Sequence, residues 1–213
     1  MMTPPSFAEI IVDGPDAQAF LHGQLAADVK AIGPGHWGYA CYCVPDGRVQ
    51  ALVMLAHATT EQWRLLLPSD VCERVLVRLQ RYRLRARCSL SASDVAIAST
   101  EQASAASYHC AAFCWSLGSA VPSVLSAALW SQQIDLGIPW IVAATSELFF
   151  FLILALERLQ GFSLRKGCFP GQEIVARTHY LGRSKRRLVR LSQVDGELSG
   201  AAGEELSSEH SQK

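Results

Sequence analysis

The sequence predicts an α+β fold, and three observations support that prediction. Within about 85 residues the hydrophobic pattern changes from strand to helix, three strands and helix, which is typical of α+β layers and not of a parallel doubly wound sheet. No glycine-rich loop follows the first predicted strand, so nucleotide binding by a βαβ unit is not indicated. Half of the 213 residues are apolar and 18% are charged, as is typical of a globular protein with a real core.

The first expected elements are a strand at 7–12 and a helix that runs to about Val29. Asp13-Gly14-Pro15-Asp16 separates them and supplies a turn with proline early in the helix. Two β-rich runs, 37–44 and 48–56, then flank a turn at Pro45-Asp46-Gly47, which predicts a hairpin. A further strand is expected at 62–67.

A helix is expected after this strand, with apolar residues at helical spacing from Val71 to Tyr82. Ser69 or Asp70 is its expected N-cap, with Glu73 closing a capping box. Its other face bears arginines, which form either a solvated face or one side of an anion site. Later expected elements are strands at 94–99, 108–117, 162–164 and 188–191, and helices at 124–132 and 147–160.

The expected domain organisation has three parts. A first α+β unit spans 1–88, and a second, similar unit spans 89–191. The remaining segment, 192–213, is acidic and poor in bulky apolar residues, so we expect it to be disordered.

Composition and charge exclude several classes of protein. Net charge is zero, and few aromatic residues interleave with the arginines, so direct nucleic-acid binding is not expected. The longest apolar run, 148–156, is too short for a membrane span. Seven cysteines without a secretory signal indicate reduced thiols in a cytoplasmic protein, and their spacing lacks the pairs of a metal site, so no metal is expected.

The segment of greatest functional interest is Lys166-Gly167-Cys168-Phe169-Pro170-Gly171-Gln172-Glu173. A lysine and neighbouring arginines favour the thiolate of the cysteine, which is the nucleophile and metal ligand. The two glycines permit a tight bend or a close backbone approach. The segment therefore predicts a reactive or ligating thiol on a basic loop, or alternatively a small buried cysteine beside a solvated basic strand.

This run resembles the Lys-Gly-Cys-[Phe/Tyr]-x-Gly-Gln-Glu signature of the YgfZ family, folate-binding proteins related to the T-protein (aminomethyltransferase) of the glycine cleavage system. The similarity continues from Glu173 to Arg183, and a second similar stretch lies at Phe20–Val29. The resemblance implies two related α+β units around a central folate-binding channel, followed by a C-terminal β-barrel. A barrel needs on the order of 80 further residues, so this chain is expected to lack it.

The resemblance also implies a cofactor and a site. The cofactor is tetrahydrofolate or a folate derivative, with or without a polyglutamate tail, whose carboxylates suit arginine. Cys168, assisted by Lys166, is the implied functional thiol. Gln172 and Glu173 either contact the ligand or begin a helix, whose N-terminus favours a carboxylate. The implied cofactor-binding residues are Lys166, Gly167, Gly171, Gln172, Glu173 and Arg177.

The implied function is that of an accessory protein for iron–sulfur cluster assembly or repair, with iron–sulfur client or assembly proteins as partners and indirect support of tRNA modification. One alternative is an aminomethyltransferase-like one-carbon transferase, and another is a non-catalytic interaction module. T-proteins bear two aspartates at the hairpin where this chain has Gln50 and Ala51, neither of which titrates near pH 7. The chain is therefore not expected to be a classical enzyme, and a transferase would need Glu173 or Asp28 as its carboxylate.

Overall fold

A computed structural model of the chain describes residues 4–94, 96–99, 107–109, 114–118, 127–182, 186–190 and 202–204. The elements in chain order are β1 (Phe7–Asp13), α1 (Ala17–Gln24), the 3₁₀ helix η1 (Val29–Ala31), β2 (Trp37–Cys43), β3 (Val49–His57), β4 (Gln62–Pro68), α2 (Ser69–Arg83), β5 (Ser89–Asp94), β6 (Ala96–Ser99), β7 (Ser107–His109), β8 (Cys114–Gly118), α3 (Ala127–Asp135), the 3₁₀ helix η2 (Leu156–Leu159) and α4 (Gln172–Leu181).

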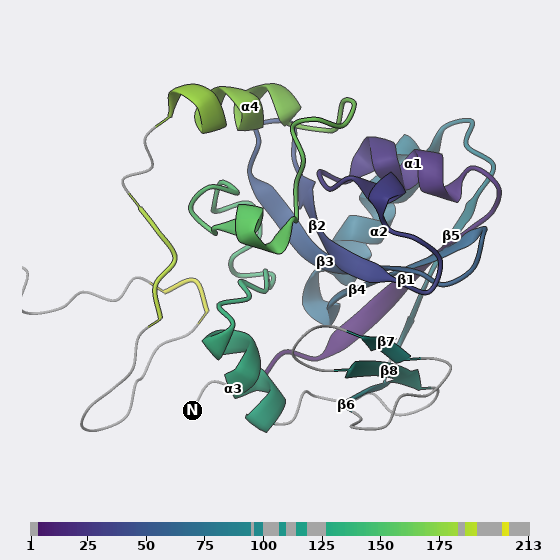
Figure 1. The fold of residues 1–213 in the computed structure, drawn as a ribbon, viewed down its shortest axis with the longest axis horizontal. Helices are drawn as coiled ribbons and strands as arrows, with labels where there is room; N and C mark the ends of the chain where they lie inside the picture. The colour runs from purple at the N-terminus through teal and green to yellow at the C-terminus, as the bar shows by residue number, and fades with distance from the viewer. Residues whose placement is uncertain are drawn as a thin grey trace, which may run out of the picture.

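A five-stranded antiparallel sheet with the strand order β2-β3-β4-β1-β5 lies at the centre of the fold (Figure 1). A three-stranded antiparallel sheet has the order β6-β8-β7. Strands and helices thus combine without parallel pairing among the described strands, and the predicted α+β class is confirmed. The pairing of β5 with β1 carries the large sheet past residue 88, and the division into units at 1–88 and 89–191 stays a prediction.

Alternating side chains along the strands build two cores on opposite faces of the large sheet. The first core joins the inward side chains of the sheet to α1 and α2, with Trp63 and Leu65 fully buried at its centre. The second core joins the other face to residues 138–175, with Leu52 and Phe151 buried there. The segment before and within the cysteine motif is therefore packed against the sheet.

The hairpin, the strand at 62–67 and the following helix are confirmed, but the predicted cap of that helix is wrong. Pro68 occupies the N-cap position of α2, and no side chain caps it. The Asp70 carboxylate instead accepts a hydrogen bond from the Ala143 backbone N–H at 2.9 Å. The Asp70 carboxylate is thus engaged in a tertiary hydrogen bond and does not cap α2.

The helix predicted at 147–160 is also wrong, because this segment consists of turns and the short η2. Glu147, Ala155 and Gln160 adopt positive φ angles of 64°, 52° and 53°, which an α-helix cannot contain. The backbone of Glu147 and Phe149 hydrogen-bonds instead to Val49 at the start of β3. Apolar composition correctly indicated burial here, but edge pairing with the sheet replaced the helix.

Other differences are smaller. Helix α1 ends at Gln24 rather than near Val29, because Leu25 turns to an extended conformation. The described residues of the expected strands at 162–164 and 188–191 are irregular. Apart from 202–204, the predicted acidic tail at 192–213 lies outside the described residues.

Candidate functional site

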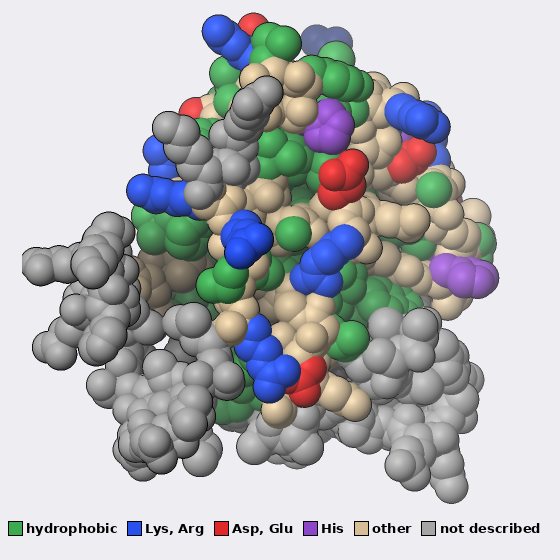
Figure 2. Space-filling model, turned by 60° about the vertical axis from the view of Figure 1, so that its left-hand side comes forward, with side chains coloured by type: hydrophobic (Ala, Val, Ile, Leu, Met, Phe, Trp, Pro, Cys, Tyr) green, Lys and Arg blue, Asp and Glu red, His purple; other side chains and the backbone are tan. Residues whose placement is uncertain are grey.

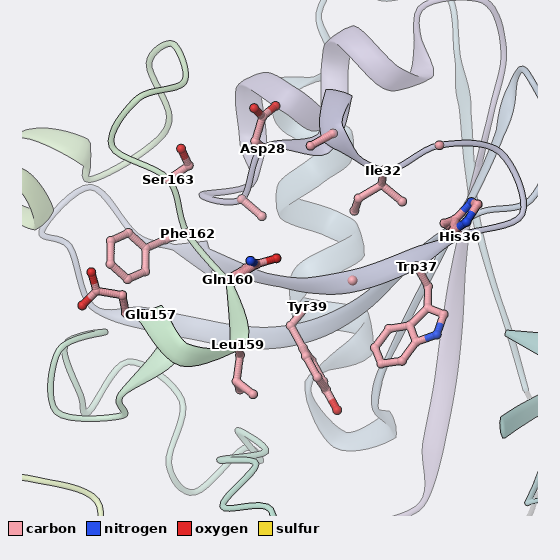
Figure 3. Close-up of a pocket in the computed structure, with 14 residues that line it drawn as sticks. Asp28, Ile32, His36, Trp37, Tyr39, Glu157, Leu159, Gln160, Phe162 and Ser163 are labelled. Atoms are coloured by element: carbon pink, nitrogen blue, oxygen red, sulfur yellow. The ribbon is translucent and has the colours of Figure 1, made fainter. Parts of the chain in front are cut away.

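A pocket of about 630 Å³ lies between the η1 region, the first half of β2 and the segment around η2 (Figure 3). Its wall includes three aromatic side chains, Trp37, Tyr39 and Phe162, and two carboxylates, Asp28 and Glu157. In Figure 3 the Gln160 side chain extends from the η2 segment toward the middle of the labelled residues. The volume is within the range of small-molecule sites, and the mixture of aromatic and charged groups suits a flat polar ligand.

Backbone hydrogen bonds fix the walls of this pocket relative to one another. The Cys41 N–H on β2 donates to the Gly161 carbonyl at 2.8 Å, and the Ser163 N–H donates to the Ala26 carbonyl at 2.8 Å. The Ala26 N–H in turn donates to the Cys41 carbonyl at 2.8 Å. The chain leading to the cysteine motif is therefore held between β2 and the end of α1.

Lys166 ties the motif to helix α1. Its Nζ donates to the backbone carbonyls of His22 and Leu25, and the side chain is buried. Carbonyls at the C-terminal end of a helix lack partners within the helix and attract cations. Lys166 therefore acts as a cap for α1, and its Nζ also lies 5.2 Å from the Phe169 ring centroid.

Burial lowers the pKa of Lys166 to about 8, while Asp28 and Cys168 partly oppose this shift by their negative charge. Burial also lowers the pKa of His22, assisted by the nearby cations Lys166 and Lys30. The His22 Nδ1 atom lies 3.5 Å from Asp28 Oδ1. Asp28, in the pocket wall, is thus an acidic group close to the buried Lys166 and the partly buried His22.

Glu157 reaches the pocket from η2, a single turn bounded on both sides by residues in the left-handed region, Ala155 and Gln160. Non-glycine residues in that region cost about 1–3 kcal/mol and often occur at ligand sites. The neighbouring Arg158 secures the turn by donating to the Leu136 carbonyl at 2.7 Å and to the Gly137 carbonyl. The fold thus holds a strained turn that places Glu157, an exposed residue, at the edge of the pocket.

The cysteine motif itself lies over the β2–β3 turn. Cys168 is exposed, whereas the cysteines of β2 are buried. Gly171 has a φ of +80°, and a Cβ placed there would lie 2.5 Å from the Val44 carbonyl oxygen and 2.9 Å from the Gly47 Cα. The same construction at Gly167 meets nothing within 4 Å. Gly171 therefore serves the close approach of two backbones, which is one of the two uses that the sequence predicted for the motif glycines.

Gln172, Glu173 and Arg177 belong to α4, which begins directly after Gly171. Glu173 is in the first turn, where a carboxylate is favoured by the helix dipole, and both Glu173 and Arg177 are exposed. None of the six predicted cofactor-binding residues is among those that line the large pocket. Their roles in ligand binding stay predictions, and Lys166 reaches the pocket only through its neighbour Asp28.

Gln50, which the sequence resemblance places where T-proteins bear an aspartate, occupies an irregularity in the sheet. Cys43 pairs with Val49 and Tyr42 pairs with Ala51, so Gln50 has no partner on β2. Such a bulge redirects the side chain of the extra residue. Gln50 Nε2 donates to Glu147 Oε1 at 2.7 Å, and Ala51 is fully buried in the first core. Sequence analysis did not identify Glu147, because its 97-residue separation from Gln50 conceals the contact.

The next feature is the surface of the molecule and the distribution of charged side chains on it. On the face drawn in Figure 2, the described Lys and Arg side chains are scattered among neutral and acidic groups and form no continuous basic patch. Within the described ranges, no set of three or more His, Cys, Asp or Glu side chains is arranged to hold a metal ion. The helices of those ranges are too short or too polar to cross a membrane.

Comparisons with known proteins identify relatives over most of the chain, although no family model matches it. An uncharacterized protein of Haemophilus influenzae is 28% identical over 84% of this chain and 68% of its own length. The "tRNA-modifying protein YgfZ" of Klebsiella pneumoniae is 26% identical over 97% of this chain and 75% of its own. The protein of the same name from Blochmanniella pennsylvanica is 22% identical over 85% of this chain and 68% of its own.

Among solved structures, the glycine cleavage system aminomethyltransferase T of Bartonella henselae aligns with a TM-score of 0.41 and 18% identity. That alignment covers 43% of this chain and 25% of the other. The sequence relatives, in contrast, match 84–97% of the chain and include several proteins of one name. Together with the Lys166–Glu173 motif, these matches show that the chain is a member of the YgfZ family.

Proposed function

We propose that the protein binds tetrahydrofolate or a related folate in the pocket between η1, β2 and η2. The pocket carries this proposal, because its aromatic walls and carboxylates match the chemistry of a pterin ring. A pterin is flat and presents adjacent N–H donors on one edge, which a carboxylate accepts as a pair. Trp37, Tyr39 and Phe162 provide apolar surface for the ring, and Glu157 or Asp28 provides the acceptors.

The residues present also suit the acidic end of a folate. Lys30 and His36 lie at or beside the pocket and are exposed, so they can approach the carboxylates of a glutamate or polyglutamate tail. Bound tetrahydrofolate supplies one-carbon chemistry at its N5 and N10 nitrogens. The contribution of this chain is to hold the ring between aromatic side chains and to keep a carboxylate at its polar edge.

The wider role that we propose is an accessory function in iron–sulfur cluster assembly or repair in the cytoplasm, with indirect support of tRNA modification. Membership of a family whose relatives are named tRNA-modifying proteins supports it, as does the exposed thiol of Cys168. One cysteine is too few to hold a cluster, which needs about four protein ligands. Cys168 would therefore act on a cluster or sulfur held by a partner protein.

Calorimetry with tetrahydrofolate under reducing conditions tests the ligand. Wild type and Cys168→Ala are expected to bind alike, because Cys168 does not line the pocket. Glu157→Gln is expected to bind about tenfold more weakly, since a charge-assisted hydrogen bond contributes about 1.5–3 kcal/mol. Glu73→Gln, an exposed glutamate on α2, is the matched control. Absence of binding by the wild type would overturn the folate proposal.

The position of Asp28 favours one second candidate, a folate-dependent one-carbon transferase. Asp28 is a carboxylate in the pocket wall and can serve as the base that Gln50 cannot provide. Turnover with an aminomethyl donor that is abolished by Asp28→Asn would establish the transferase. The accessory role is supported by a different result. In that case turnover is absent, and the wild type but not Cys168→Ala restores iron–sulfur enzyme activity in a depleted strain.

A further inference from the structure

A second pocket, of about 440 Å³, lies between helix α2 and the β2–β3 hairpin. It shares no lining residue with the proposed folate pocket. Arg74, Arg78 and Arg81 of α2 line it, and their spacing places them on one face of the helix. The opposite wall includes Pro45 and Gln50 of the hairpin.

This pocket has a surplus of positive charge. Glu73 is the one carboxylate among its lining residues, against three guanidinium groups. Within the described part of the chain, no ion pair involves any of these three arginines. The nearby Asp46 is directed to Arg48, at 3.6 Å from its Nε. The arginines are therefore available to a bound anion.

Arg78 is held in a fixed position by packing. Its guanidinium carbon lies 5.5 Å from the Tyr42 ring centroid and 5.8 Å from that of Tyr82. Burial raises the pKa of Tyr42 to about 12, so this phenol is neutral at physiological pH and does not cancel the charge of Arg78. An arginine fixed against aromatic rings loses little side-chain entropy when it binds a ligand.

Gln50 supplies an independent indication that this pocket takes a ligand. Its side chain is 3% exposed, and the amide orientation is set because Nε2 must face the acceptor Glu147 Oε1 at 2.7 Å. This leaves Gln50 Oε1 buried without a hydrogen-bond partner in the described structure. An unsatisfied buried acceptor costs about 1–3 kcal/mol, so a donor on a ligand would stabilise the site.

The ligand must therefore combine an anion with a hydrogen-bond donor. A phosphate offers several oxygens in a geometry that arginine pairs recognise, and a hydroxyl group offers the donor. We propose that this pocket binds a small phosphate monoester of a hydroxy compound, such as a sugar phosphate, through Arg74, Arg78 and Arg81, with a hydroxyl donating to Gln50 Oε1. This site is independent of folate binding.

Calorimetric titration with ribose 5-phosphate at low ionic strength tests this site. Wild type is expected to bind saturably, and Arg78→Met and Arg81→Met are each expected to weaken binding about tenfold or more. Arg81 is exposed, so its variant keeps the test informative if Arg78→Met disturbs packing with the tyrosines. Arg85→Met removes the same charge from an exposed residue outside the pocket and should leave binding unchanged.

Three further ligands separate the contribution of the anion to binding from that of the hydrogen-bond donor. Ribose lacks the anion and should not bind, whereas sulfate lacks a donor for Gln50 and should bind more weakly than ribose 5-phosphate. Inorganic phosphate should bind with intermediate affinity. Equal weakening by Arg85→Met, equal affinity for sulfate, or no saturable binding would overturn the proposal. Glu157→Gln should leave ribose 5-phosphate binding intact, so this site and the folate proposal can fail separately.

Discussion

Gly171 has a backbone φ of +80° and sits against the β2–β3 turn, whereas Gly167 in the same motif has open space around it. The contrast shows that glycine is present at these two positions of the motif for different physical reasons. At Gly171 both conformation and space exclude a side chain. At Gly167 neither does, so its presence in the motif is not explained by packing.

We therefore expect Gly171→Ala to lower the free energy of unfolding by at least about 2 kcal/mol, from backbone strain and the contact with Val44. Gly167→Ala is the matched control and should change it by less than about 1 kcal/mol. Urea unfolding followed by circular dichroism measures both. Equal effects of the two substitutions would show that the motif does not pack on the hairpin as described.

Thiol reactivity is a second property of single residues. Cys168 is exposed, but Cys41 and Cys43 are buried, and burial raises the pKa of the Cys43 thiol to about 12. Because the thiolate is the reactive form, iodoacetamide at neutral pH should modify Cys168 in the folded protein. Cys41 and Cys43 should be modified only after unfolding. Peptide mapping by mass spectrometry reads out each site, and early labelling of Cys43 would contradict the burial of β2.

At the scale of elements, the cysteine motif and helix α1 are joined by Lys166. The pKa of Lys166 is about 8 in the folded protein and near 10.5 in an unfolded chain, because burial disfavours the charged amine. Between these values the unfolded state binds more protons than the folded state. The contribution of Lys166 to stability therefore rises with pH from about 8 to 10.5, as the neutral amine keeps its role as donor.

The corresponding measurement is the free energy of unfolding from pH 7 to 10.5 for wild type and Lys166→Met. The difference between the two proteins should shift in favour of the wild type as the pH rises through 8, because Met cannot titrate. ¹³C NMR of the Lys166 Cε resonance gives the pKa directly. A constant difference across this range would mean that Lys166 is solvated and not a cap of α1.

The sequence predicted elements well where the local pattern and the turn chemistry agreed. Pro45-Asp46-Gly47 between two β-rich runs predicted the hairpin, and helical spacing predicted α2. The helix at 147–160 failed because its apolar residues are buried by pairing with Val49, a contact between residues far apart in the chain. The ligand roles of the motif residues stay predictions. Asp28 and Glu157 line the same pocket only through tertiary packing, so spacing alone could not place them at one site.

At the scale of the whole molecule, the five-stranded sheet is shared by two cores. Leu65 is fully buried in the core with α1 and α2, and Phe151 is 1% exposed in the core formed with residues 138–175. Every central strand contributes side chains to both. A core that shares its sheet with another cannot be lost without exposing the apolar strands between them.

We therefore expect Leu65→Ala and Phe151→Ala to lower the midpoint of one common unfolding transition. Each should cost about 2–5 kcal/mol, the range for removing a large buried side chain. Coincident urea curves from circular dichroism and tryptophan fluorescence test this, since Trp63 lies in the first core and Trp140 in the second. Two separated transitions, with Phe151→Ala shifting only one, would instead show that the segment after β5 folds as an independent unit.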